Sequence, residues 1–359
     1  MPPRFRSLAL LTLAAALSAR FAAGAPKPVP VKVVVVAMFE PGEDTGDRAG
    51  EFQYWVEREK LERVLAFPAG KRPLRMNKDG SILGVVTGPG VTNATSSIMA
   101  LGMDPRFDLS KAYWLVAGIA GVDPEDASIG SAAWASYVVE SDLVYEVDAR
   151  EAPADWPYSR LAIGAKRPNT LPGPRDANLD GLVFPLNKEL AGWAFAVTKD
   201  TPLGDTAEMA EWRGRYAAAF PNAGKPPFVL QGDSLGGSTY WHGRAMTRWA
   251  NDWVKMWTAN DGNYVMTNLE DNGTAMALTR LTRIGRADFN RLLVLRTGSN
   301  YCMPPPGVAV VESMTAPYAG RFPSLDAAHR VGSRVVHALI EGWAKWRVAP
   351  PTRSAMLPR

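Results

Sequence analysis

Residues 267–281, TNLEDNGTAMALTRL, place one carboxylate where it could hold the hydroxyl groups of a sugar. Glu270 opens a run of small, apolar, helix-forming residues, and Asp271 and Asn272 follow it directly. A lone acid beside small residues at the start of a buried helix suggests a pocket in which hydroxyl groups meet a carboxylate. The same acid could serve only to complement the positive end of the helix macrodipole. Residues from other parts of the chain must decide between these two interpretations.

Further polar or glycine-rich segments follow runs that are typical of strands. We predict strands over residues 31–38, 81–87, 113–117, 228–230, 264–267 and 292–296, and one long or two short strands over residues 131–145. Ligands of open α/β sheets bind beyond the carboxyl ends of the strands. The residues found at such ends, besides Glu270, are Glu40, Gly88, Gly90, Gly118, Gly121, Ser299 and Asn300. Together they predict one pocket built from distant parts of the chain.

The elements that must position this pocket alternate between strand and helix. Thr92 or Asn93 can cap the helix after the second strand. Helices are predicted near residues 92–101, 187–197, 206–220, 241–257 and 324–346. The alternation predicts an α/β fold, a three-layer αβα sandwich whose central sheet is mostly parallel or mixed. Residues 148–226 are the least regular part, and we interpret them as an insertion in a single domain that spans residues 26–359.

Composition limits the classes of partner and cofactor. The chain has 359 residues, 47% of them hydrophobic, and a formal net charge of +4. Removing Arg4, Arg6 and Arg20 of the N-terminal segment leaves +1 (4 minus 3). No cluster of Lys or Arg remains that would hold a phosphate backbone, so we expect no nucleic-acid partner. With three histidines and one cysteine, Cys302, we expect no metal, no other cofactor and no internal disulfide.

The N-terminus has the organisation of a secretory signal. Arg4 and Arg6 precede an apolar run over residues 8–17, and small residues at 22–25 suit cleavage after Gly24. We therefore predict a signal peptide over residues 1–25 and a periplasmic or secreted protein. An uncleaved membrane anchor is the alternative. No later run reaches the roughly 20 apolar residues that a spanning helix needs.

Three strings together carry a resemblance to a known family. They are GDSLGGSTYWHG at 232–243, TNLEDNGTAMALTRL at 267–281 and RTGSNYCMPPPG at 296–307. They resemble the purine nucleoside permease family, which shares the nucleoside phosphorylase and nucleosidase fold, over roughly residues 31–346. The resemblance implies a nucleoside phosphorylase-like fold, a purine nucleoside or free base as ligand, and a link to nucleoside uptake. A separate membrane transporter and a second copy of the chain are the partners we expect.

The resemblance also implies roles for individual residues. Glu40 is the nearest match to the glutamate that activates the attacking water, and Glu43 is the fallback. Glu270 matches the carboxylate that grips the ribose hydroxyls. Asn300 stands where many relatives have an aspartate that protonates the departing base.

The string at 232–243 supplies the remaining candidates. Tyr240 and Trp241 would stack on the base, while His242 would either bind a ribose hydroxyl or cap the following helix. Asp233 would orient its loop. In that helix, Trp249, Trp253 and Trp257 recur every four residues, and we interpret them as a stripe of residues that packs in the core.

Two departures from the family pattern bear on the reaction. Ile119 and Val116 stand where phosphorylases hold phosphate with Ser and, in some cases, Arg, so we expect hydrolysis rather than phosphorolysis. An amide at Asn300 cannot give up a proton, but it can bridge the N7 and O6 atoms of a 6-oxopurine. With the resemblance, the sequence predicts an exported purine-nucleoside-binding protein that is linked to nucleoside uptake and hydrolyses the N-glycosidic bond. A non-catalytic nucleoside-binding component of a transport system and a phosphorylase are the alternatives.

Overall fold

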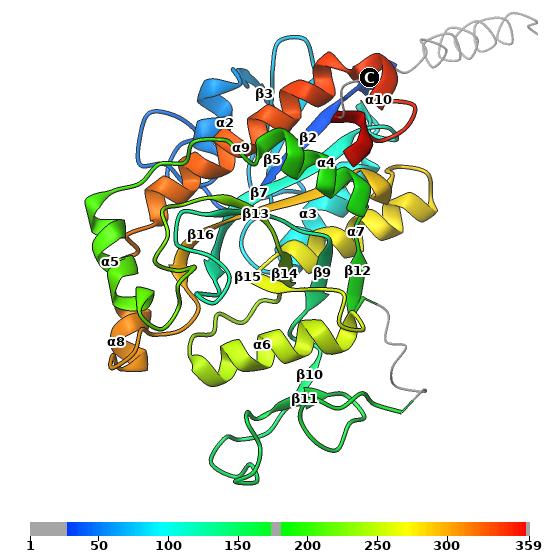
Figure 1. Ribbon diagram of the computed structural model, residues 1–359. Coiled ribbons are helices and arrows are strands. Elements are labelled where there is room, and N and C mark those ends of the chain that lie inside the picture. The colour runs from blue at the N-terminus through cyan, green and yellow to red at the C-terminus, as the bar shows by residue number, and fades with distance from the viewer. Residues whose placement is uncertain (1–26, 174–180, 357–359) are drawn as a thin grey trace, which may run out of the picture.

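The computed structural model describes residues 27–173 and 181–356, so the predicted signal peptide lies outside the described residues. Helices cover both faces of a large central sheet, as Figure 1 shows. The strand β2 (Val33–Ala37) explains this arrangement, because all five of its residues are buried. Val34 packs into one apolar cluster and Val33 and Val35 pack into another on the opposite face. The predicted three-layer αβα sandwich is confirmed.

The central sheet has twelve strands and mixed pairing. Its path runs β12-β9-β14-β15-β7-β2-β5-β4-β3, and β16, β8 and β13 branch from β7. β2 is parallel to β5 and β7, and β16 is parallel to β7, whereas β15 is antiparallel to β7. The bounds of the other strands in this sheet are β3 Arg63–Leu65, β4 Leu74–Met76, β5 Ile82–Val86, β7 Tyr113–Val122, β8 Ala132–Trp134, β9 Tyr137–Glu140, β12 Val183–Pro185, β13 Val229–Gln231, β14 Asp233–Gly236, β15 Tyr264–Asn268 and β16 Leu292–Tyr301.

Two small sheets lie beside the central one. They pair β1 with β6 and β10 with β11. Their bounds are β1 Val29–Pro30, β6 Phe107–Asp108, β10 Val144–Glu146 and β11 Arg160–Ala162. The region 131–145, predicted as one long or two short strands, contains three short strands, β8, β9 and β10.

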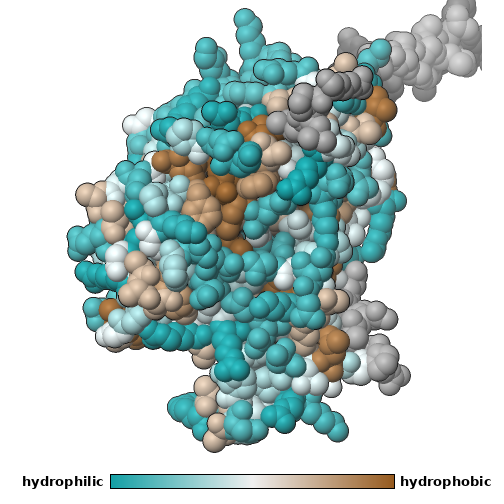
Figure 2. All heavy atoms as spheres, in the orientation of Figure 1, coloured by the Kyte–Doolittle hydropathy of each residue, from teal (hydrophilic) through white to brown (hydrophobic). Residues whose placement is uncertain are grey.

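The helices divide between the two faces of the sheet. Apolar residues of α3 and α7 pack in the cluster on one face, and those of α2, α4 and α9 pack in the cluster on the other. The helices are α2 Gln53–Arg58, α3 Val91–Met103, α4 Lys188–Thr198, α5 Ala207–Ala217, α6 Arg244–Trp257, α7 Asp271–Arg283, α8 Val310–Thr315, α9 Arg321–Glu341 and α10 Trp343–Trp346, with 3₁₀ turns η1 Phe289–Arg291 and η2 Arg353–Met356. On the face shown in Figure 2, hydrophilic residues cover most of the surface and apolar residues gather in a central area.

The ends of two helices differ from the prediction. Gly90, with a φ of 91°, is the N-cap of α3, so neither Thr92 nor Asn93 caps it. The predicted helix over 324–346 begins earlier and is interrupted at Gly342, which separates α9 from α10. In α6, Trp249 and Trp253 are buried, as the stripe predicted.

The two longest strands also differ from the prediction, and this change shapes the site. β7 continues through Gly118 and Gly121, because its pairing with β16 extends to the residue opposite Tyr301. Gly118 and Gly121 therefore lie within a strand and do not form a loop. A Cβ at Gly118 would come within 2.4 Å of the Glu51 carboxylate, so glycine is required for Glu51 to approach the strand.

Candidate functional site

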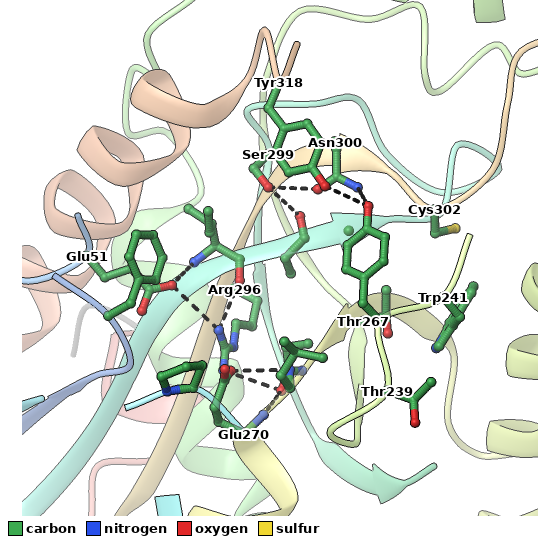
Figure 3. A pocket seen from close by; sticks show the side chains of 18 residues that line it. Glu51, Thr239, Trp241, Thr267, Glu270, Arg296, Ser299, Asn300, Cys302 and Tyr318 are labelled. Atoms are coloured by element: carbon green, nitrogen blue, oxygen red, sulfur yellow. Dashed lines mark hydrogen bonds and ion pairs between the residues drawn. The ribbon is translucent and has the colours of Figure 1, made fainter. Parts of the chain in front are cut away.

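A cavity of about 340 Å³ lies at the carboxyl ends of several strands, where the sequence predicted a pocket (Figure 3). Segments after β2 and β5 contribute to it, together with the last residues of β7, β15 and β16 and two loops. The lining residues are Phe39, Glu51, Pro89, Ile119, Ala120, Gly121, Thr239, Tyr240, Trp241, Thr267, Asn268, Leu269, Glu270, Arg296, Ser299, Asn300, Cys302 and Tyr318. The sheet thus brings together residues that are distant in sequence.

One buried arginine organises one side of the cavity. Arg296 Nη2 lies 2.6 Å from Asp271 Oδ1 and 3.0 Å from Glu270 Oε2. Its Nη1 lies 3.9 Å from Glu51 Oε1 and donates to the Ile119 carbonyl at 2.9 Å. Burial opposes a charge on Arg296, yet the three carboxylates outweigh it and hold the guanidinium pKa above its ordinary range. Three acids therefore share one counter-ion away from water.

Glu51 is the one of these three acids that comes from the loop after β2. Its carboxylate accepts hydrogen bonds from the Met38 amide at 2.8 Å and the Ile119 amide at 2.7 Å. Burial raises the pKa of Glu51 to about 8, and the charge of Glu270 adds to this, while Arg296 and the two amides act against it. At neutral pH the Glu51 carboxyl therefore holds its proton most of the time, and it loses the proton under mildly alkaline conditions.

Glu40 does not take the place predicted for it. It is absent from the cavity lining, and its Oε2 accepts hydrogen bonds from the amides of Phe52 at 2.9 Å and Gln53 at 2.7 Å. The carboxylate thus satisfies free amides at the start of α2. The loop after β2 returns to the strand, where the Glu51 amide donates to the Phe39 carbonyl at 2.9 Å. This return brings Glu51, and not Glu40, to the cavity.

Glu270 lies where its sequence position predicted, at the start of α7 and against the cavity. Its Oε2 also accepts a bond from the Leu269 amide at 3.2 Å, and the Gly90 amide approaches Oε1 at 3.4 Å. Burial raises the pKa of Glu270, and Arg296 counteracts this. The Gly90 amide thus supports the Glu270 carboxylate, although Gly90 is not one of the lining residues. Gly88, two residues before Gly90, has a φ of 88°.

The other side of the cavity is aromatic and carries amide and hydroxyl groups. Ser299 Oγ donates to Asn300 Oδ1 at 2.9 Å, and Asn300 Nδ2 lies 3.4 Å from the Tyr240 hydroxyl. The hydroxyls of Tyr240 and Tyr318 lie 2.7 Å apart. Trp241 also lines the cavity and is only 8% exposed. A flat ring with polar edges fits between these groups.

Two further predicted residues lie outside the cavity lining. His242 faces a small neighbouring space, where its Nε2 lies 3.0 Å from Ser313 Oγ, and burial lowers the pKa of its ring. Asp233 accepts hydrogen bonds from the amides of Tyr137 at 2.8 Å and Asn263 at 2.7 Å. Asp233 therefore ties β9 to the segment before β15.

The described part of the cavity wall has no cation available for an anion. Arg296 is the one Lys or Arg among the described lining residues, and its charge is already shared by Asp271, Glu270 and Glu51. The Ile119 amide, which could have helped to hold phosphate, donates instead to Glu51. The interior therefore suits a neutral ligand with hydroxyl groups and an aromatic ring.

Comparison with known proteins gives the family. Residues 30–350 match the family described as Purine nucleoside permease (NUP). The chain belongs to the purine nucleoside permease family. A purine nucleoside permease of Candida albicans is 30% identical over 320 residues, which are 88% of this chain and 76% of that protein. A Schizosaccharomyces pombe protein named "Probable purine nucleoside permease" is 31% identical over 277 residues, 75% of this chain and 79% of that protein.

Solved structures show that this permease-family chain shares the nucleosidase fold. Futalosine hydrolase of Helicobacter pylori superposes with a TM-score of 0.51 at 14% identity, over 87% of this chain and 99% of that one. The 5′-methylthioadenosine/S-adenosylhomocysteine nucleosidase of the same organism, with butyl-thio-DADMe-Immucillin-A, gives 0.50 at 11% identity, over 88% and 98%. Within residues 27–173 and 181–356, no helix is both long and apolar enough to cross a membrane.

Proposed function

We propose that this protein binds purine nucleosides outside the cytoplasm in support of nucleoside uptake, and that it hydrolyses their N-glycosidic bond. The observation that carries the proposal is the arrangement of the cavity. Glu51 and Glu270 lie on one side, Asn300 and the aromatic residues lie on the other, and the one cation among the described lining residues is already neutralised. These groups match the base, the ribose and an activated water, but not a phosphate nucleophile.

In the proposed reaction, Glu270 accepts hydrogen bonds from the ribose 2′ and 3′ hydroxyls. Ionised Glu51 takes a proton from a water molecule, whose oxygen forms a bond to C1′. The bond from C1′ to N9 breaks and its electron pair remains on the base. Asn300 stabilises that charge by hydrogen bonds until the base takes a proton from solvent. No residue in this scheme replaces the acid that many relatives have at the position of Asn300.

The preferred base in this proposal is a 6-oxopurine. An amide can donate to O6 through Nδ2 and can accept from a protonated N7 through Oδ1. In the free protein, Asn300 Oδ1 already accepts from Ser299 Oγ, which holds the amide in one orientation. Inosine and guanosine are thus better ligands than adenosine.

A non-catalytic nucleoside-binding role is the second candidate, and one observation favours it. Glu51 has a pKa of about 8, so most of the molecules lack an ionised base at neutral pH. With an amide at position 300, both proton-transfer groups are weak under those conditions. In this second role the protein captures nucleosides for a separate membrane transporter.

Incubation of the mature protein with inosine, with and without inorganic phosphate, tests the proposal. Release of hypoxanthine without phosphate supports hydrolysis. Release that depends on phosphate supports a phosphorylase and contradicts the cavity argument. Calorimetric binding without release supports the second candidate, and neither binding nor release refutes both. Fractionation of the native host, followed by N-terminal sequencing of the mature chain, tests the proposed export and the cleavage after Gly24.

A further inference from the structure

Two arginines without acidic partners lie next to the cavity, on its Phe39 side. Arg321, the first residue of α9, has its Cζ atom 5.9 Å from the centre of the Phe39 ring and 5.8 Å from that of Phe322. Arg48 has its Cζ atom 5.3 Å from the centre of the Phe322 ring. Within residues 27–173 and 181–356, neither guanidinium has an ion pair, and the buried Nε of Arg321 has no hydrogen-bond partner. Two positive charges are thus held on aromatic faces without neutralisation.

The neighbouring loop contains acids, but in the described structure none of them pairs with Arg48 or Arg321. Asp44 pairs with Arg72 and Arg75, each at 2.7 Å. Asp47 Oδ2 accepts a hydrogen bond from the Glu43 amide at 2.9 Å, and Asp47 is exposed to water. Among the described residues, no carboxylate of this loop forms an ion pair with either arginine.

The arginine pair lies toward one end of the ligand that the proposed function places in the cavity. Phe39 lines the cavity, and its carbonyl accepts a hydrogen bond from the Glu51 amide. Figure 3 shows Glu51 on the side of the cavity opposite Trp241. A nucleoside with its base beside Asn300 and its ribose at Glu270 directs C5′ away from the base. An orientation with C5′ toward Phe39 brings it to the side of the cavity on which Arg321 contacts the Phe39 ring.

We infer that Arg48 and Arg321 form a subsite for a phosphate on C5′ of the bound nucleoside, so that purine nucleoside 5′-monophosphates are ligands of this protein. The inference rests on the proposed binding of purine nucleosides. Guanidinium groups present a planar fork of donors that matches phosphate oxygens. The Phe322 ring, 41% exposed, packs against both guanidinia, so a phosphate bound there keeps part of its hydration.

This subsite is distinct from one for a phosphate nucleophile. A phosphate that attacks C1′ would need to sit beside Glu51 and Glu270, where the available positive charge is already neutralised. The arginine pair lies beyond Phe39, so a phosphate there reaches C5′ and not C1′. A tethered phosphate and free inorganic phosphate therefore predict different results.

Calorimetry of the mature protein at low salt distinguishes a phosphate tethered at C5′ from free inorganic phosphate. The ligands are inosine, inosine plus inorganic phosphate, and inosine 5′-monophosphate. We expect the monophosphate to bind about 10-fold more tightly than inosine, and added inorganic phosphate to leave the inosine affinity unchanged. The advantage should shrink as the salt concentration rises. Equal affinity for inosine and its monophosphate overturns the subsite alone. Binding of neither compound also refutes the proposed function.

Variants tie the effect to the two arginines. In the double variant R48M/R321M, the ratio of the two dissociation constants should fall to about 1, and in R48M alone it should fall about 3-fold. R48M keeps the test valid if the double variant does not fold, because Arg48 is an exposed loop residue. R248M, which removes an exposed arginine of α6, is the matched control and should keep the wild-type ratio. A ratio that survives in both R48M and the double variant overturns the inference.

Discussion

Hydrolysis of inosine by this protein should accelerate as the pH rises from neutral to mildly alkaline values. Glu51 acts as the proposed base only when it is ionised, and burial with the neighbouring Glu270 raises its pKa to about 8. Activity that depends on an ionised acid is low below the pKa of that acid and reaches a plateau above it. The rate should therefore rise with pH as Glu51 loses its proton. If Glu51 acted as a general acid, the rate would instead fall with rising pH.

The magnitude follows from the titration. With a pKa of about 8, about one tenth of the Glu51 carboxyls are ionised at pH 7 and about nine tenths at pH 9. The turnover number should thus rise about 10-fold between these two conditions. Ligand binding should change less, because Glu270, and not Glu51, holds the ribose in the proposed complex.

The assay is the initial rate of hypoxanthine release at saturating inosine, measured over this range in buffers of constant ionic strength. The variant E51Q keeps the shape of the side chain but has no titrating carboxyl, so it should lose about 10²- to 10⁴-fold in rate and all of the pH dependence. E43Q changes an exposed glutamate of the same loop and should retain the wild-type profile. A flat wild-type profile, or a rise that persists in E51Q, would refute the assignment of Glu51 as the base.

Three further substitutions test the remaining parts of the site. E270Q removes the charge proposed to accept the ribose hydroxyls, so calorimetry should show inosine binding weakened about 10- to 100-fold and hypoxanthine binding nearly unchanged; equal losses for both would contradict the assignment. N300D restores a proton donor beside the leaving base and should raise the hydrolysis rate at neutral pH about 100-fold in the inosine assay, whereas an unchanged rate would show that Asn300 does not contact the base. R296M leaves buried carboxylates without their counter-ion and should lower the free energy of unfolding in urea by about 3–5 kcal/mol, and a loss below about 1 kcal/mol would argue against its structural role.

Local patterns in the sequence predicted most of the elements. The apolar runs predicted the bounds of β2 and β5 to within two residues. A strand that is buried on both faces is apolar along its whole length, so its pattern is easy to recognise. Helices α4 and α5 also lie where they were expected, each with a side-chain cap, from Asn187 and Thr206. The full lengths of β7 and β16 were not predicted, because their glycines resemble turns until the partner strand is known.

Within the site, too, residues placed by local sequence were predicted and residues placed by distant contacts were missed. Glu270 was predicted because it opens a helix directly after a strand, so its place depends on neighbouring residues. Glu51 was missed because it reaches the cavity only when the loop after β2 folds back, which the bond from the Glu51 amide to Phe39 shows. The position of Arg296 directly after an apolar run could have indicated the site. An arginine there can be buried only if carboxylates pair with it.

The sequence by itself determined the family, the alternation of strands and helices, and the ribose-binding candidate, because each of these is written in contiguous residues. Only the tertiary structure decided which glutamate meets the cavity and how the charge of Arg296 is shared. The physical reason is that burial and Coulomb interactions depend on distances in space. Burial raises the pKa of Glu51, Arg296 lowers it and Glu270 raises it further, and both of these residues are far from Glu51 along the chain.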